Sequence, residues 1–374
     1  MLDEVDVLGK ALNGKVARVA VIGMGRWGKR LIRAFDSMSD VILCCNRSST
    51  DEHTWLQRHF PRVRASHDAR EAFQERTVQA VAIATPVNSH AHLVAQAIES
   101  GKHIFVEKPL ATSVSEAESL VNAARKARLQ LFVGHTFLFH PAFDYLSSST
   151  QHDSVQSIHL SWSKLGTFGE DIVWNLVSHE VSIAIALFRQ SPDQVTLLET
   201  HGAHTSRDSV TLQLGFPDGE SCYINVDRCA PFKRKIVKVL ARSGKLLVWE
   251  GDDLYRLTAL PKFERVPLSS EEPLMREVHT FLDAVNRDRP TLGRSRRHRG
   301  SDLHRLDVTR ERSQGDRHDP RLLRSLDRST GIAQRPLETA RDPRPGHGDR
   351  VGAACTGEAL PDGQRAACQA RRSS

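Results

Sequence analysis

Long apolar runs and paired cysteine motifs are both missing from this 374-residue chain. No stretch of about 18 consecutive apolar residues occurs, so the sequence predicts no membrane-spanning helix and no membrane partner. The N-terminus lacks the basic start and apolar run of a signal peptide, which favours a cytoplasmic protein. The six cysteines never occur as C-x-x-C, and the chain is too long to resemble a small disulfide framework.

Several catalytic motifs are absent as well. The chain has no G-x-S-x-G and no phosphate loop ending in Gly-Lys-Ser or Gly-Lys-Thr, which argues against a serine hydrolase or a nucleoside triphosphatase. The pairs His90/His92 and His135/His140 have spacings that metal sites use, but no cysteine or carboxylate gathers with them. We therefore expect no metal site.

Lysine and aromatic residues are missing from the last part of the chain. Residues 291–374 contain 18 Arg, no Lys, 11 acidic residues and no Phe, Trp or Tyr, whereas residues 1–290 carry 34 basic and 34 acidic residues. The whole net charge of +7 thus resides in the tail. A disordered tail or a basic arm for nucleic acid would have such a composition. A shifted reading frame through GC-rich DNA accounts for it better, and we expect no nucleic-acid partner.

After an N-terminal extension (residues 1–15), residues 16–134 alternate short apolar runs with longer amphipathic segments. The runs predict strands at Val19–Ile22, Val41–Cys45, Val78–Ala84, His103–Val106 and Gln130–Val133. Helical spacing follows in Trp27–Ser37, His90–Glu99 and Ser115–Arg128. Strands that alternate with helices predict an α/β fold with a doubly wound parallel sheet, which is a Rossmann domain when it binds a dinucleotide.

Residues 135–290 have a different texture and predict an α+β domain with a largely antiparallel, open sheet. The expected strands are Ile158–Ser163, Gln194–Thr200, Ser209–Phe216, Glu220–Asp227, Ile236–Ala241 and Lys245–Trp249, and the expected helices are about 174–188 and 273–285. The basic stretch from Lys233 to Lys238 is interpreted as a solvated strand face, with contact to an anionic substrate as the sharper alternative.

A glycine-rich turn provides the strongest chemical signal. Gly23, Gly25 and Gly28 form G-x-G-x-x-G between the first strand and a helix, with Arg26 and Trp27 inside the motif. The glycines allow a tight turn, close approach of a pyrophosphate and close helix packing, and the helix N-terminus would hold the pyrophosphate. The context favours a dinucleotide cofactor over a glycine turn without a ligand.

The end of the second strand bears on the choice of cofactor. An acid there would bind the ribose of NAD, and a cation would suit the extra phosphate of NADP. This chain has Asn46, Arg47 and Ser48 instead, with no acid before Asp51. The sequence therefore slightly favours NADP, and NAD with a weaker ribose contact stays almost as plausible.

Two further strand ends supply candidate cofactor ligands, because ligands bind at the carboxyl ends of parallel strands. Thr85, Pro86, Asn88 and His90 follow one strand, where Asn88 or Ser89 could equally cap the next helix. Glu107 and Lys108 follow the next strand. A buried lysine beside a nicotinamide would have a lowered pKa suited to proton transfer, although most lysines are solvated.

These motifs together resemble the Gfo/Idh/MocA family of NAD(P)-dependent oxidoreductases, which includes glucose–fructose oxidoreductase and inositol dehydrogenase. The matching segments are residues 23–29, 85–90, 101–109, 133–135 and 174–179. The resemblance implies a Rossmann domain, a second domain whose open sheet forms homodimers or homotetramers, and a sugar, inositol or nucleotide-sugar substrate.

The resemblance also implies roles for individual residues. Lys108 and His179 would flank the reacting carbon as catalytic residues, and Asn175 and His135 would bind substrate. The family commonly has an aspartate where this chain has Asn175, and an amide cannot accept a proton. Acid–base work would therefore rest on Lys108 and His179. A non-catalytic NAD(P)-binding sensor on the same fold is the alternative.

Overall fold

Sheet A is a six-stranded parallel sheet in the first part of the chain. The computed structural model describes residues 17–47 and 50–287, so Ser48, the extension 1–15 and the tail 291–374 lie outside the described residues. The strand order is β3-β2-β1-β4-β5-β6, with every neighbouring pair parallel. The strands are β1 (Arg18–Ile22), β2 (Asp40–Cys45), β3 (Arg64–Ser66), β4 (Ala80–Ile83), β5 (His103–Glu107) and β6 (Leu131–Gly134). This order is that of a doubly wound Rossmann sheet, as predicted.

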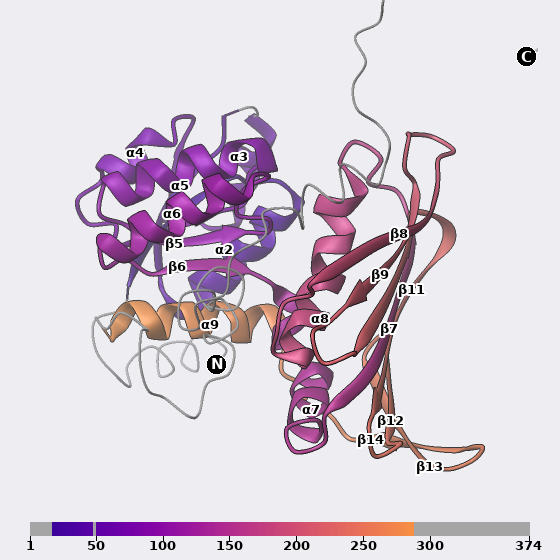
Figure 1. Cartoon of the computed structure of the whole chain (residues 1–374). Coiled ribbons are helices and arrows are strands. Elements are labelled where there is room, and N and C mark those ends of the chain that lie inside the picture. The colour runs from indigo at the N-terminus through magenta and orange to yellow at the C-terminus, as the bar shows by residue number, and fades with distance from the viewer. Residues whose placement is uncertain (1–16, 48–49, 288–374) are drawn as a thin grey trace, which may run out of the picture. The chain divides into compact units, whose positions relative to one another are not determined.

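Helices cover both faces of sheet A because its strands are apolar on both sides, as the fully buried β4 illustrates. The helices are α2 (Arg26–Met38), α3 (Thr50–His59), α4 (Arg70–Gln74), α5 (His90–Glu99) and α6 (Val114–Lys126), with a short 3₁₀ turn η1 (Val87–Ser89) before α5. Val94 and Leu120 belong to the core on one face, and Phe35 and Phe105 to the core on the other. Figure 1 shows α5 and α6 together on one side of β5 and β6.

Sheet B is an eight-stranded sheet in the order β14-β13-β12-β11-β7-β10-β9-β8. Its neighbouring pairs are antiparallel except β7 and β10, which run parallel. The strands are β7 (Val155–Leu165), β8 (Gln194–His201), β9 (Ser209–Gly215), β10 (Ser221–Asp227), β11 (Cys229–Ala241), β12 (Leu246–Glu250), β13 (Asp253–Ala259) and β14 (Lys262–Val266). The predicted α+β domain with a largely antiparallel sheet is confirmed.

The helical segments of this second part are η2 (Thr136–Phe139), α7 (Pro141–Ser149), η3 (Val173–Val177), α8 (Ser178–Phe188) and α9 (Pro273–Asn286). The segment η3 is a π-helix that runs directly into α8, so the predicted single helix over 174–188 changes its winding at Ser178. None of the helices within the described ranges is long and apolar enough to cross a membrane.

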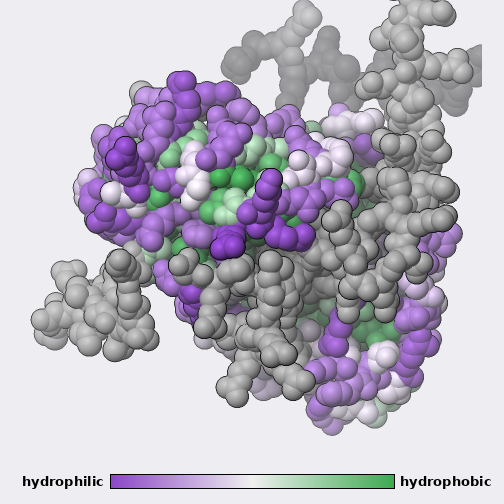
Figure 2. Space-filling model, turned by 60° about the vertical axis from the view of Figure 1, so that its left-hand side comes forward, coloured by the Kyte–Doolittle hydropathy of each residue, from purple (hydrophilic) through white to green (hydrophobic). Residues whose placement is uncertain are grey.

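Helix α9 comes from the end of the described chain and packs onto the Rossmann core. Phe281 lies edge-on to Phe35 at 6.0 Å and to Phe105 at 5.7 Å between ring centroids, and it also contacts Phe132. Edge-to-face aromatic packing of this kind adds stability beyond the buried area. Figure 2 shows the outer surface on one face, where hydrophilic side chains predominate and apolar residues appear as patches between them.

Candidate active site

The glycine-rich turn between β1 and α2 is packed as tightly as its motif predicts. Gly23 has φ +99°, and a Cβ added to it would lie 2.4 Å from the Ala84 carbonyl oxygen. A Cβ added to Gly28 would lie only 2.0 Å from the Gly23 carbonyl oxygen, whereas one added to Gly25 would meet nothing within 4 Å. Gly23 and Gly28 therefore serve close packing, and Gly25 leaves open space at the turn.

The N-terminus of α2 fits a dinucleotide pyrophosphate. Its N-cap is Gly25, no side chain caps the first amides, and the first turn contains no acid. The amides and the helix dipole are therefore available to an anion. Arg26 is exposed in this first turn, where a cation is unfavourable for the helix by itself but useful to a bound phosphate.

The end of β2 contributes one residue to the turn and presents another to solvent. Asn46 Oδ1 accepts a hydrogen bond from the Met24 backbone N–H at 3.3 Å, so this side chain holds the glycine-rich turn. Arg47 is exposed beside it.

The loop after β4 is organised by His90, which is buried beneath it. Its Nδ1 lies 2.8 Å from the Pro109 carbonyl oxygen and its Nε2 lies 2.8 Å from the Thr85 carbonyl oxygen. His90 thus ties the loop after β4 to the loop after β5. Burial lowers the pKa of His90, and the two carbonyl contacts oppose that shift.

The other predicted residues of this loop lie nearer the surface. Pro86 and Asn88 are exposed, and Thr85 Oγ1 accepts a hydrogen bond from Ser89 at 2.7 Å. Neither η1 nor α5 has a side-chain cap, so the capping alternative for Asn88 and Ser89 is not realised. Asn88 stays in an open position at the carboxyl edge of sheet A.

Glu107 lies beneath the site and accepts a hydrogen bond from the Trp27 indole N–H. Burial raises its pKa to about 7, against the opposing effects of Trp27 and Lys108. A second buried acid, Glu277 of α9, accepts a hydrogen bond from Thr136 Oγ1 at 2.7 Å. Burial and then the charge of Glu107 raise the pKa of Glu277 well above its usual value. The two acids thus disfavour each other's ionised form.

Lys108 joins the Rossmann sheet to the second sheet's helix. Its Nζ donates a hydrogen bond to the backbone carbonyl of Asn175 at 2.8 Å. Burial lowers the pKa of Lys108, while Glu107 and Glu170 act in the opposite direction. The structure therefore brings together Lys108, which directly follows β5, and Asn175 of η3.

His179 and Asn175 both point unpaired polar atoms into this region. His179 Nδ1 and Asn175 Nδ2 are buried and have no hydrogen-bond partner among the described residues. Burial lowers the pKa of His179 well below its usual value, and the charges of Lys108, Lys235, His135 and Lys164 lower it further. His179 is therefore neutral near pH 7 and can accept a proton.

The π-turn η3 contains Asn175 and directly precedes the helix that holds His179. π-helical turns are rare and occur mostly at functional sites. Asp171 begins the segment, with its Oδ1 accepting from the Val173 backbone N–H at 2.8 Å. Its other oxygen pairs with Arg207, so Asp171 has a structural role. His135 is buried nearby, and its backbone N–H bonds to Glu277.

The interpretation of the basic stretch on β11 as a solvated face is wrong for Lys235. Lys233, Arg234 and Lys238 are exposed, but the Lys235 side chain is only 10% exposed and forms an ion pair with the fully buried Glu180. Its Nζ also lies 4.3 Å from the centroid of the Phe137 ring. Lys235 faces inward because residues alternate between the two faces of a strand.

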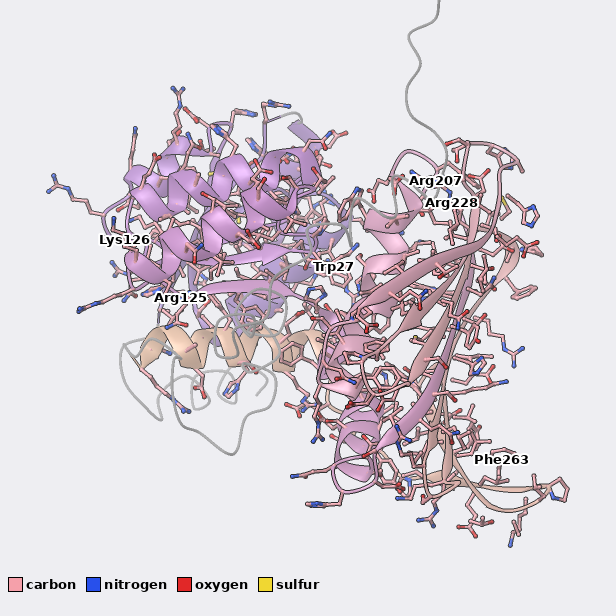
Figure 3. All side chains as sticks on the ribbon, viewed as in Figure 1. Trp27, Arg125, Lys126, Arg207, Arg228 and Phe263 are labelled. Atoms are coloured by element: carbon pink, nitrogen blue, oxygen red, sulfur yellow. The ribbon has the colours of Figure 1, made fainter. Side chains whose placement is uncertain are left out.

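A buried arginine fixes the loop that leads into η3. Arg228 donates to Asp208 Oδ1 at 3.0 Å, and to the carbonyls of Thr167 and Glu170 at 3.0 and 2.6 Å. Figure 3 shows Arg228 and Arg207 close together near one end of the second sheet's strands. This cluster therefore supports the loop that precedes η3.

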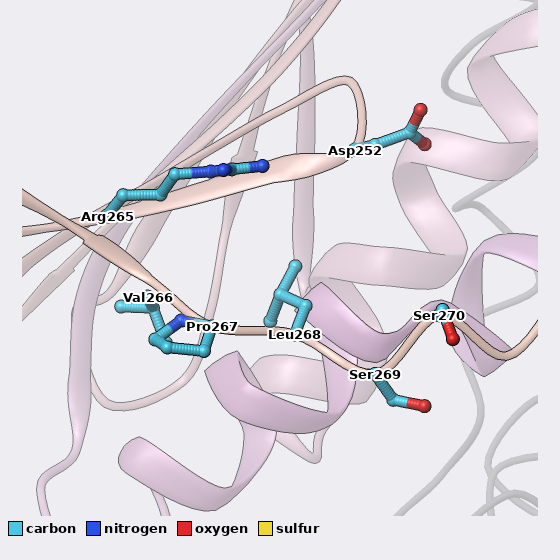
Figure 4. A pocket seen from close by; sticks show the side chains of 7 residues that line it. All are labelled: Asp252, Arg265, Val266, Pro267, Leu268, Ser269 and Ser270. Atoms are coloured by element: carbon cyan, nitrogen blue, oxygen red, sulfur yellow. The ribbon is translucent and has the colours of Figure 1, made fainter.

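A pocket elsewhere carries none of these groups. It is lined by Asp252 of the turn between β12 and β13, by Arg265 and Val266 of β14, and by residues 267–270 of the segment that leads to α9 (Figure 4). In the part of the chain that the structure describes, no three His, Cys, Asp or Glu side chains gather as metal ligands.

The profile of the oxidoreductase family with an NAD-binding Rossmann fold matches residues 17–135. Over these residues the chain matches the Gfo/Idh/MocA family. The glycine-rich turn, Lys108 and the preceding Glu107 all lie within the matched range.

Relatives extend the similarity beyond the Rossmann domain. UDP-N-acetylglucosamine 3-dehydrogenase of Acidithiobacillus ferrooxidans is 23% identical over 289 residues, which is 73% of this chain and 90% of that protein. Its crystal structure matches with a TM-score of 0.68 at 21% identity, over 77% of this chain and 93% of that one. An oxidoreductase from Agrobacterium radiobacter, solved with NAD⁺, L-tartaric acid and magnesium, matches with a TM-score of 0.66 at 18% identity, over 78% and 94%. These structures share the fold.

Proposed function

We propose that the protein is an NAD(P)-dependent dehydrogenase that moves hydride between the nicotinamide and a CH–OH or keto carbon of a sugar, inositol or nucleotide sugar. The contact between Lys108 Nζ and the Asn175 carbonyl carries the proposal, because it joins the end of β5 to the segment that holds His179. The family and its sugar and polyol dehydrogenases support the reaction class.

The candidate residues have different roles in the reaction, which follow from their charges. A bound nicotinamide supplies the hydride acceptor or donor. His179 is neutral and takes the hydroxyl proton during oxidation, then returns it in the reverse direction. The Lys108 ammonium orients the substrate oxygen and stabilises negative charge on it. Asn175 Nδ2 donates to a neighbouring hydroxyl, and His135 lines the same region.

The glycine-rich turn, Arg26 and the N-terminus of α2 would hold the pyrophosphate, and the exposed Arg47 would reach the 2′-phosphate of NADP. We therefore propose a slight preference for NADP over NAD. Replacement of Arg47 with Ser should raise the Kd for NADP⁺ and leave that for NAD⁺ unchanged. Equal changes for both cofactors would remove Arg47 from this role.

We also propose a homodimer or homotetramer formed through the outward face of sheet B. Leu165, Leu198 and Phe232 are 64%, 49% and 58% exposed on strands of this sheet. Sedimentation velocity would test the proposal, and a monomer at micromolar concentration would contradict it.

A cofactor titration followed by a substrate panel tests the function. NAD(P) should quench tryptophan fluorescence, and turnover should occur with at least one inositol, hexose or nucleotide sugar. Lys108→Ala should lower kcat by about 100-fold or more and leave the cofactor Kd nearly unchanged. The control Lys126→Ala removes an exposed lysine from α6 (Figure 3) and should change neither value. Cofactor binding without turnover of any substrate would instead favour a sensor.

A further inference from the structure

Two lysines follow the last paired residues at one end of the β7–β11 ladder, beside the proposed site. Trp162 pairs with Lys235 and Ser163 with Arg234, and the next residues outward on the two strands are Lys164 and Lys233. The register shifts immediately beyond this point, so the ladder opens where the two lysines lie. The charges of Lys164 and Lys233 act on each other, since Lys233 contributes to the lowered pKa of Lys164.

Lys164 lies on the face of sheet B that carries Trp162. Alternation along a strand places Lys164 on the same side as Trp162, and Lys164 Nζ lies 5.9 Å from the centroid of that ring. The His179 ring lies 5.5 Å from the same Trp162 ring. Lys164 is therefore one aromatic side chain away from His179.

These cations have no ion-pair partner within residues 17–47 and 50–287. Among the described residues, neither Lys164 nor Lys233 takes part in a salt bridge, although Glu170 opposes the shift in the pKa of Lys164. Arg26 adds a third positive charge that acts on Lys164. Like charges near each other disfavour each other's charged form, so an anion that binds there would relieve a cost present in the free protein.

We infer that Lys164 and Lys233 form a subsite for an anionic group of the substrate, so that the preferred substrate is a sugar or polyol derivative with a carboxylate or a phosphate. The inference rests on the proposed function for the position of the reacting carbon. The unpaired Asn175 Nδ2 and His179 Nδ1 point to a polar ligand in the same region. A neutral hexose would leave the positive charges of the two lysines without a nearby negative charge.

Isothermal titration calorimetry in the presence of saturating NADP⁺ tests this subsite separately from catalysis. The three probes are D-glucose, D-glucuronate and UDP-glucose, which represent a neutral sugar, a carboxylate and a phosphate ester. The double variant Lys164→Gln/Lys233→Gln removes both charges. Lys238→Gln is the matched control, because Lys238 is an exposed lysine on the opposite face of the same strand β11.

We expect at least one of the two anionic probes to bind about tenfold or more tightly than D-glucose, and the double variant to lose that preference. The control should keep it, and 0.5 M NaCl should weaken it by screening. Preference for D-glucuronate or for UDP-glucose identifies the anion as carboxylate or phosphate.

The inference is overturned if neither anion is preferred over D-glucose, if Lys238→Gln has the same effect as the double variant, or if the double variant weakens only NADP⁺ binding. The last result would assign the lysines to the cofactor. Retained anion preference without hydride transfer would refute the proposed function and leave the subsite supported.

Discussion

The ion pair between Lys235 and Glu180 is the clearest place to test how the scaffold controls His179. Glu180 is fully buried, and Lys235 is held by its carboxylate and by the rings of Phe137 and Trp162, whose centroids lie 4.3 and 4.4 Å from Nζ. Lys235→Met keeps most of the length of the side chain and removes its charge. The change leaves Glu180 as a buried carboxylate without a cation.

The expected cost follows from this burial. Loss of one member of a buried ion pair typically destabilises a protein by about 3–5 kcal/mol, whereas replacement of both members by apolar residues is often neutral. Burial already raises the pKa of Glu180 and lowers that of Lys235, which shows that desolvation opposes both charges. The double variant Lys235→Met/Glu180→Met should therefore be far more stable than Lys235→Met alone.

Urea unfolding of the wild type, both single variants and the double variant would measure the coupling between the two side chains. We expect a coupling energy of at least about 2 kcal/mol. The pH dependence of kcat/KM gives a second readout. The charge of Lys235 lowers the pKa of His179, so its removal raises that pKa and moves the acid limb of the profile to higher pH.

The double variant separates the two effects, because it restores stability and still lacks the Lys235 charge. An acid limb at the wild-type pH in the double variant would refute the electrostatic part of the reasoning. If the double variant lost as much stability as the two single variants together, the pairing of Lys235 with Glu180 would be refuted.

Three further predictions concern the scaffold. Gly28→Ala should lower the midpoint of thermal unfolding because its Cβ would meet the Gly23 carbonyl oxygen at 2.0 Å, whereas Gly25→Ala should keep the wild-type midpoint and weaken only NAD(P) binding in a fluorescence titration. Phe281→Ala should cost about 3–5 kcal/mol in urea unfolding, and a cost below 1 kcal/mol would contradict the packing of α9. Burial raises the pKa of Asp208, but the combined hydrogen bonds from Thr205, His204 and Ala203 outweigh this effect and bring the pKa well below its usual range. Its contribution to stability should therefore be present at neutral pH and disappear as the pH falls below the normal carboxyl range, and Asp208→Asn should flatten that part of the pH profile of the urea midpoint.

The elements that sequence patterns predicted are those whose burial is encoded locally. The apolar runs that gave β1 and β4 are buried on both faces, so composition alone locates them. The strands β3, β13 and β14 were missed. β3 has three residues, and β14 is almost wholly exposed, so neither has a period to detect. The π-turn at η3 was missed because its sequence has ordinary helical spacing.

For the candidate site too, sequence patterns indicated some residues and missed others. Motifs indicated Lys108 and His179 as candidates, because strand ends and family segments are contiguous in sequence. The partners of buried charges are set by distant segments, so the pairing of Lys235 with Glu180 was beyond the reach of pattern reasoning. Glu277 had a signal that was overlooked, since it lies on the apolar face of α9 between Leu274 and Phe281, three and four residues away. An acid on such a face indicates a buried role.

The amide of Asn175 determines how the buried charges near His179 act on it. An aspartate at this position would add a negative charge to the residue whose backbone carbonyl accepts a hydrogen bond from the Lys108 ammonium. The amide leaves the positive charges of Lys108, Lys164 and Lys235 acting together on His179. Such a histidine is neutral throughout the physiological range but is a weak base, so on the proposed mechanism proton removal must be helped at the substrate. The same cations give that help, because they stabilise the developing alkoxide and lower the pKa of the hydroxyl that His179 deprotonates.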